Sequence, residues 1–169
     1  MDAELLKLAE QLAQTLKRAG LSLTTAESCT GGGLAEVLTT VPGSSIWFER
    51  GFVSYSNLAK REMLEVSTET LARHGAVSEP TARAMAEGAL SHSPADLAVA
   101  ITGIAGPGGG TEAKPVGTVC FAWARRKHAT RSTTLHFPGD RAAVRRQSVA
   151  AAIAGLQGYL REDTDPTAK

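Results

Sequence analysis

The architecture of this chain follows from one segment, Leu21-Ser22-Leu23-Thr24-Thr25-Ala26-Glu27-Ser28-Cys29-Thr30-Gly31-Gly32-Gly33. Its first part, Leu21–Ala26, is rich in threonine and leucine, which is typical of a strand, and the glycine triplet marks a tight turn. Pro42-Gly43 then ends the helical pattern that follows the triplet. The segment predicts a strand, a turn that contains Ser28, and a helix over about 32–40.

A first helix is expected before this segment. Leucine and alanine recur at helical spacing between Asp2, a suitable N-cap, and Gly20, a typical helix end. The pattern predicts an amphipathic helix packed on the rest of the fold through one apolar stripe: Leu5, Leu8, Ala9, Leu12, Ala13 and Leu16.

Strand and helix patterns alternate along the rest of the chain. We predict strands at 46–55, 97–101, 116–124 and 130–137, the last two forming an antiparallel hairpin, and helices that begin near Asn57, Ser78 and Gly139, with Asn57 as a cap. This order predicts an α/β fold, a three-layer α/β/α sandwich with a mixed, mostly parallel sheet. We expect a single domain over 1–162 and a polar tail over 163–169.

The composition of the chain disfavours several classes of function. The chain has 169 residues, 43% hydrophobic and 21% charged, and its 18 basic and 17 acidic residues leave a net charge of +1. So small a charge disfavours nucleic-acid binding, which relies on a basic surface. No apolar run is long enough to span a bilayer and no signal peptide begins the chain, so we expect a cytoplasmic protein without membrane partners. Two cysteines and four scattered histidines form no metal motif, and we expect no metal.

The turn after the first strand carries the most chemistry. It exposes the Ser28 side chain where a strand gives way to a helix, beside backbone N–H groups that have no helical partner. That arrangement suits a nucleophile next to an oxyanion hole, but it also suits a simple N-cap or a binding site for phosphate or carboxylate. Cys29 is the alternative nucleophile, although a small buried thiol is the more common role of such a residue.

A serine nucleophile needs a base. No histidine lies in a motif that points to such a role, but Tyr55 ends a predicted strand and Lys60 follows in the first turn of the next helix. Burial would lower the pKa of a lysine and allow it to act as a general base. The alternative is an ordinary solvated lysine, and spacing alone favours that alternative.

Three separated motifs together carry a resemblance to a known family. They are Ala26–Gly32, Tyr55-Ser56-Asn57 followed by Lys60, and Thr102–Pro107. In this combination and order the chain resembles the CinA C-terminal domain family over nearly its whole length. Members of that family include stand-alone nicotinamide mononucleotide deamidases, and longer members add an N-terminal domain that we do not expect here.

The resemblance implies an activity and a site. It implies hydrolysis of the carboxamide of nicotinamide mononucleotide to nicotinate mononucleotide and ammonia, as part of pyridine nucleotide recycling, without a cofactor. The nucleophile would be Ser28, assisted by Lys60 and Tyr55, and backbone N–H groups within Thr30, Gly31 and Gly32 would hold the oxyanion. We also expect a homo-oligomer.

Other residues are candidates for substrate binding. Thr102 and Gly103 follow a buried strand, where open α/β sheets bind ligands. Arg145 occupies the start of the buried stripe of the last helix, so it either meets a phosphate, packs at the rim of the core or holds a carboxylate. Arg141 lies one turn earlier on the same side and could help to bind the phosphate. Glu27 either orients Lys60 or caps the turn, and the glycine-rich loop 103–115 is either a lid over the substrate or a flexible connection.

Two other functions fit the same residues. One is a catalytically silent nucleotide-binding module that acts through partners, and the other is a serine amidase for a different amide. The presence of Ser28, Tyr55 and Lys60 together favours catalysis over the silent module.

Overall fold

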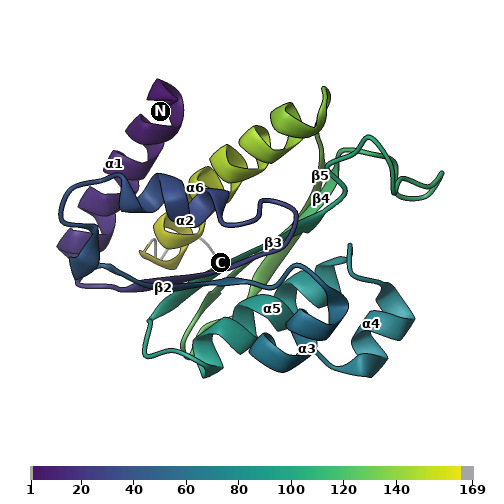
Figure 1. Cartoon of the computed structure of the whole chain (residues 1–169). Helices are drawn as coiled ribbons and strands as arrows, with labels where there is room; N and C mark the ends of the chain where they lie inside the picture. Colours follow the sequence, from purple (N-terminus) through teal and green to yellow (C-terminus); the bar gives the residue numbers. More distant parts are fainter. Residues whose placement is uncertain (1, 165–169) are drawn as a thin grey trace.

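A five-stranded sheet with the order β2-β1-β3-β4-β5 forms the centre of the molecule (Figure 1). This computed structural model describes residues 2–164. The strands are β1 (Leu23–Glu27), β2 (Phe48–Val53), β3 (Leu97–Gly103), β4 (Thr118–Arg125) and β5 (Arg131–His136). β1 pairs in parallel with β2 and β3, whereas β4 is antiparallel to both β3 and β5, so β4 alone runs against the other four. The predicted mixed, mostly parallel sheet is confirmed.

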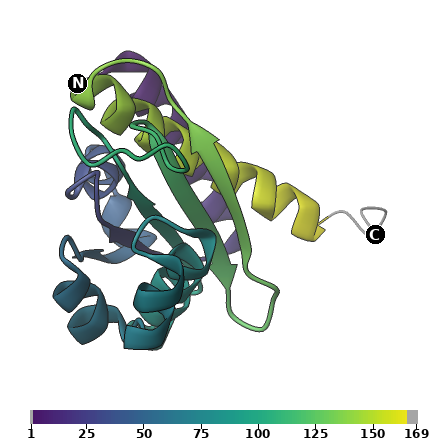
Figure 2. The same ribbon diagram turned by 90° about the vertical axis from the view of Figure 1, so that its right-hand side faces the viewer.

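Helices cover both faces of this sheet, as predicted for a three-layer sandwich. One face carries α1 (Ala3–Ala19), α2 (Gly33–Thr39) and α6 (Arg141–Thr164), and the other carries α3 (Asn57–Leu64), α4 (Thr68–His74) and α5 (Glu79–Ser91) (Figure 1). A short 3-10 helix, η1 (Ser44–Ile46), precedes β2. Figure 2 shows that the β4–β5 hairpin turn and the start of α6 lie at opposite ends of the molecule.

The first helix forms as its sequence predicts. The Asp2 carboxylate accepts hydrogen bonds from the amides of Glu4 and Leu5, at 3.0 and 3.2 Å, and Gly20 ends the helix in the left-handed region. Leu8 of the predicted stripe is partly buried and packs against the core. The other five residues of the stripe are buried: Leu5, Ala9, Leu12, Ala13 and Leu16.

The two faces of the sheet are packed differently. On β3, Leu97, Val99 and Ile101 face the core beneath α1, α2 and α6, whereas Ala98 and Ala100 face α5. Small side chains let α5 lie close to the sheet, and its predicted stripe of Ala82, Met85, Ala86, Ala89 and Leu90 is buried.

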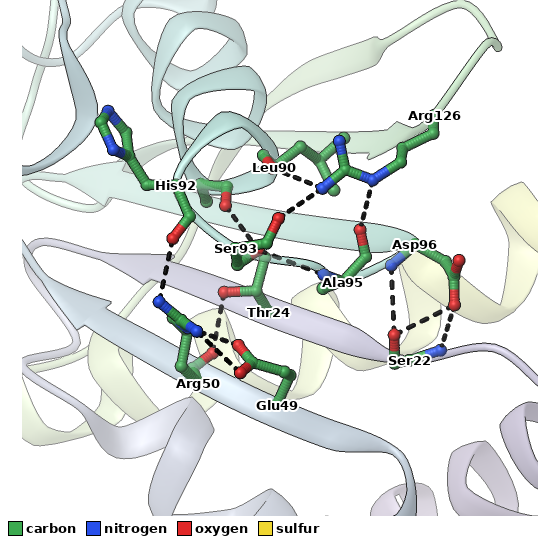
Figure 3. A network of polar contacts seen from close by, with 11 residues as sticks. Ser22, Thr24, Glu49, Arg50, Leu90, His92, Ser93, Ala95, Asp96 and Arg126 are labelled. Atoms are coloured by element: carbon green, nitrogen blue, oxygen red, sulfur yellow. Dashed lines mark hydrogen bonds and ion pairs between the residues drawn. The ribbon is translucent and has the colours of Figure 1, made fainter.

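Polar contacts fix the end of the sheet where the parallel strands begin (Figure 3). The Ser22 amide donates to Asp96 Oδ2 at 2.8 Å, which ties the start of β1 to the start of β3. Arg126 donates to three carbonyls where α5 ends and β3 begins, those of Leu90, Ser93 and Ala95. The register of β1 on β3 is thereby set at one end of the sheet, and their carboxyl ends come together at the other.

Some local features differ from the sequence predictions. α4 was not predicted, because none of its seven residues is buried and it therefore has no apolar stripe. Ser56, rather than Asn57, caps α3, since its hydroxyl accepts the Ala59 amide at 2.9 Å. α6 continues to Thr164, and residues 165–169 of the expected tail lie outside the described residues.

Within residues 2–164, no helix has both the length and the apolar character needed to cross a bilayer.

The close approach of α3 to α5 gives a prediction about stability. A Cβ added to Gly88 would lie 2.0 Å from the Leu64 carbonyl oxygen, so Gly88→Ala must push the two helices apart. We expect the free energy of unfolding to fall by about 1–3 kcal/mol in urea titrations. Gly158→Ala in α6 is the matched control, because a Cβ there would meet nothing closer than 4.0 Å. That variant should be as stable as the parent or more stable, and equal stability of the two variants would contradict the account.

Candidate active site

A cavity of about 280 Å³ opens at the carboxyl ends of β1 and β3. This is the edge at which open α/β sheets bind their ligands. Its walls come from the turn after β1, the junction of β2 and α3, the end of β3, the glycine-rich loop after β3, and the first turn of α6. The three predicted catalytic residues and two of the predicted binding residues line it: Ser28, Tyr55, Lys60, Thr102 and Gly103.

Ser28 and Lys60 are in direct contact. Lys60 Nζ lies 3.0 Å from Ser28 Oγ and donates to the main-chain carbonyls of Ser54 and Tyr55, both at 3.1 Å. The lysine is 1% exposed. It is therefore not the solvated helix residue that spacing alone favoured.

The surroundings of Lys60 favour its neutral form. Burial lowers the pKa of the amine below its ordinary value, because desolvation penalises the charged form. Within the described residues, its hydrogen-bond partners are all neutral oxygens, and none is a carboxylate. A neutral amine has two N–H groups, which match the two carbonyls, and one lone pair, which can accept the proton of the Ser28 hydroxyl.

Tyr55 contributes to this contact through its main chain. Its carbonyl oxygen lies 3.1 Å from Lys60 Nζ and 3.3 Å from Ser28 Oγ. Its side chain is 58% exposed, and its phenolic oxygen accepts from Arg141 Nη2 at 3.1 Å. The phenol is thus held at the mouth of the cavity by an arginine.

The turn after β1 has fewer open amides than its sequence predicts. The Ser28 amide donates to Ile101 O at 2.9 Å, and the Gly31 amide donates to Ser28 O at 3.0 Å, so both are used by the fold. Among the described residues, no acceptor is recorded for the amides of Cys29, Thr30 and Gly32. Cys29, directly after Ser28, also lines the cavity, and the residue after the nucleophile commonly supplies an oxyanion donor.

Glu27 caps the turn and does not touch Lys60. Its carboxylate accepts from the Thr30 hydroxyl at 2.7 Å and from the amides of Leu34 and Ala35 at 2.8 and 3.1 Å. The first amides of α2 are therefore already occupied by a carboxylate of the same chain, which argues against this helix end as a phosphate site.

The remaining predicted binding residues lie in two places. The Thr102 hydroxyl donates to Ala76 O at 2.8 Å, and Thr102 and Gly103 face the cavity. Thr30, Gly31 and Gly32 form the turn behind Ser28 and are absent from the cavity lining. Arg145 is exposed and donates to Thr30 O at 3.2 Å, while its neighbour Val144 takes the buried position.

Arg141 is the site residue that sequence reasoning underestimated. It lines the cavity, and its guanidinium donates to Gly106 O at 2.9 Å as well as to the Tyr55 phenol. The sequence offered one signal, an arginine in the first turn of the last helix. Spacing could not show that this turn meets a loop 35 residues earlier in the chain.

Cys29 is poorly suited to be the nucleophile. Burial raises the pKa of its thiol to about 11, so the reactive thiolate is scarce near neutral pH. Within the described part of the chain, no three histidine, cysteine, aspartate or glutamate residues are grouped so that they could hold a metal ion.

Comparison with known proteins identifies the family of the chain. The model of the CinA C-terminal domain matches residues 5–160. The chain is 55% identical to the nicotinamide-nucleotide amidohydrolase PncC of Escherichia coli K12, over 96% of this chain and 99% of that protein. It is 53% identical to a CinA-like protein of Akkermansia muciniphila, over 88% of this chain and 36% of the longer relative.

A solved structure extends this agreement to the fold. The competence/damage inducible protein CihA of Agrobacterium tumefaciens superimposes with a TM-score of 0.91 at 45% identity, covering 94% of this chain and 96% of that one. Both the sequence and the architecture thus match over nearly the whole length, and the chain belongs to the CinA C-terminal domain family.

Proposed function

We propose that this chain hydrolyses the carboxamide of nicotinamide mononucleotide to nicotinate mononucleotide and ammonia. The observation that carries the proposal is the 3.0 Å contact between Ser28 Oγ and the buried amine of Lys60, inside a cavity at the carboxyl edge of the sheet. The substrate is suggested by relatives named nicotinamide-nucleotide amidohydrolase, which share 52–55% of their residues with this chain.

Acylation would begin at Ser28. The hydroxyl oxygen attacks the amide carbon while its proton passes directly to the neutral Lys60 amine, which is already within hydrogen-bond distance. The Cys29 amide, with the Thr30 amide behind it, would hold the oxyanion of the tetrahedral intermediate. The C–N bond then breaks, Lys60 returns the proton to the leaving nitrogen, and ammonia departs from an acyl-serine.

Deacylation would use the same groups. A water molecule takes the place of ammonia, Lys60 accepts one of its protons, and the oxygen attacks the acyl carbon. Collapse of the second intermediate restores the Ser28 hydroxyl with the proton held by Lys60 and releases the carboxylic acid, which loses its proton to water and leaves as the carboxylate. Because the Ser28–Lys60 contact is direct, this scheme needs no relay through the Tyr55 phenol, and we assign to Tyr55 the support of Lys60 through its carbonyl.

Arg141 is the residue best placed to recognise a substrate phosphate. It carries a full charge at the cavity, and arginine binds phosphate through two parallel hydrogen bonds. Its present partners, the Gly106 carbonyl and the Tyr55 phenol, are neutral oxygens that an anion could replace. Arg145 remains a second candidate, one helical turn further along α6.

One observation separates catalysis from a silent binding module. A lysine that only binds an anionic ligand gains nothing from being buried among carbonyl oxygens, because burial weakens its charged form. Lys60 has that environment, which suits a base. The Ser28–Lys60 pair would serve a serine amidase for another amide equally well. The two functions differ only in which substrate Arg141 and the glycine-rich loop would bind.

We expect Ser28→Ala to abolish release of ammonia from nicotinamide mononucleotide, because the attacking oxygen is removed. Cys29→Ala should keep most of the activity, since its amide remains and its thiol is not the nucleophile. Ammonia and nicotinate mononucleotide are measured together, with circular dichroism as the check on folding. An inactive Cys29→Ala variant beside an active Ser28→Ala variant would assign the nucleophile to the cysteine.

We expect Lys60→Arg to lose activity almost as fully as Lys60→Ala. Arginine keeps the charge but cannot give up its proton at accessible pH. In the parent, the rate should rise with pH as Lys60 becomes neutral, and the midpoint of this acidic limb should lie below 10.5, the ordinary pKa of lysine. Normal turnover by Lys60→Arg would show that the lysine only positions the substrate.

A further inference from the structure

Glu27 is buried as completely as Lys60 but has no role in the scheme above. It is 1% exposed, and these two are the only fully buried side chains of ionisable acids and bases, cysteines aside, among the described residues. Burying a carboxylate is costly unless several donors compensate it. The donors of Glu27 are the Thr30 hydroxyl and the amides of Leu34 and Ala35, so the charge rests on the start of α2 and not on a basic side chain.

The carboxylate spans the turn that holds the nucleophile. Glu27 is the last residue of β1, and its partners lie three, seven and eight residues later. Gly32, the N-cap of α2, has a φ of 97° and no side chain to cap the helix. Glu27 therefore supplies the missing cap from the preceding strand, and this leaves position 32 free to take the left-handed conformation of the turn.

Glu27 acts on the side of the sheet away from Lys60. Its side chain reaches α2, whereas the Ser28 side chain contacts Lys60 of α3, and Figure 1 shows these helices on opposite faces. The carboxylate thus holds the turn from behind, while the amides of Cys29 and Thr30 remain without an acceptor among the described residues.

We propose that Glu27 is a positioning residue that fixes the Ser28–Gly33 turn in the shape that presents the oxyanion donors. The inference rests on the proposed function, because an oxyanion forms only if Ser28 attacks a carbonyl. Misplacing a donor weakens transition-state binding without weakening ground-state binding, so the effect belongs in kcat and not in KM.

The test is Glu27→Gln, which keeps the shape but replaces one acceptor oxygen by an NH₂ group and removes the charge. We expect kcat to fall by about a hundredfold, the loss typical of one oxyanion donor, with KM little changed and the acidic limb of the pH profile at its parental position. The matched control is Glu36→Gln, the same change at an exposed residue of α2, which should behave as the parent.

Three outcomes would overturn the proposal. They are an unchanged kcat for folded Glu27→Gln, a loss confined to KM, or a displaced acidic limb, which would mean that Glu27 acts on the charge of Lys60. Measurements are made at a temperature where circular dichroism shows the variant fully folded, so a role in stability alone leaves kcat intact and counts against the proposal.

Thr30 keeps the proposal testable if Glu27→Gln does not fold. Thr30→Val removes one donor to Glu27 and retains the Thr30 amide, so kcat should fall, and Thr30→Ser should recover part of the loss. A Thr30→Val variant with parental kcat would overturn the proposal. Ser28→Ala separates the two levels: if it remains active, the proposed function fails, and if it is inactive while the Glu27 and Thr30 variants are normal, only this inference fails.

Discussion

Lys60 is buried, no carboxylate of the described part of the chain is among its hydrogen-bond partners, and this desolvated amine constrains much of the structure around it. Its three polar neighbours are the Ser28 hydroxyl and two carbonyl oxygens, none of which stabilises a positive charge as an acid would. To hold the amine there, α3 must be packed firmly against the rest of the fold. The close approach of Gly88 to the Leu64 backbone provides this packing, because it brings the end of α3 against α5 without an intervening side chain.

The site is assembled from elements that are distant in sequence. The turn after β1 carries Ser28, α3 carries Lys60, and the end of β3 and the first turn of α6 contribute further lining residues. Parallel pairing of β1 with β2 and with β3 brings these carboxyl ends to one edge. The polar ties of Ser22 and Arg126 at the other end of the sheet hold that pairing in register.

Much of this arrangement could be predicted from the sequence, for identifiable reasons. Strands, helices and the Ser28 turn could be predicted from apolar periodicity and from glycine positions, because these signals depend only on residues close together in the sequence. The motif resemblance pointed to Lys60, where spacing alone favoured solvent. The contacts of Arg141 and the choice of open amides could not be predicted, because they depend on which loop meets which helix end. The role of Glu27 could not be predicted for the same reason, because only the folded turn shows which of its two possible roles it has.

Ser28 and Lys60 also differ in how the strands that precede them are held in the sheet. β1 has a partner strand on each side and belongs to the interior of the sheet, whereas β2 is an edge strand that pairs with β1 on one side. A chain in which β2 and α3 had not yet docked would lack the amine that lies 3.0 Å from the Ser28 hydroxyl. The Ser28–Lys60 contact therefore exists only when the edge strand and the helix that follows it are in place, so the site is completed by the least enclosed part of the sheet.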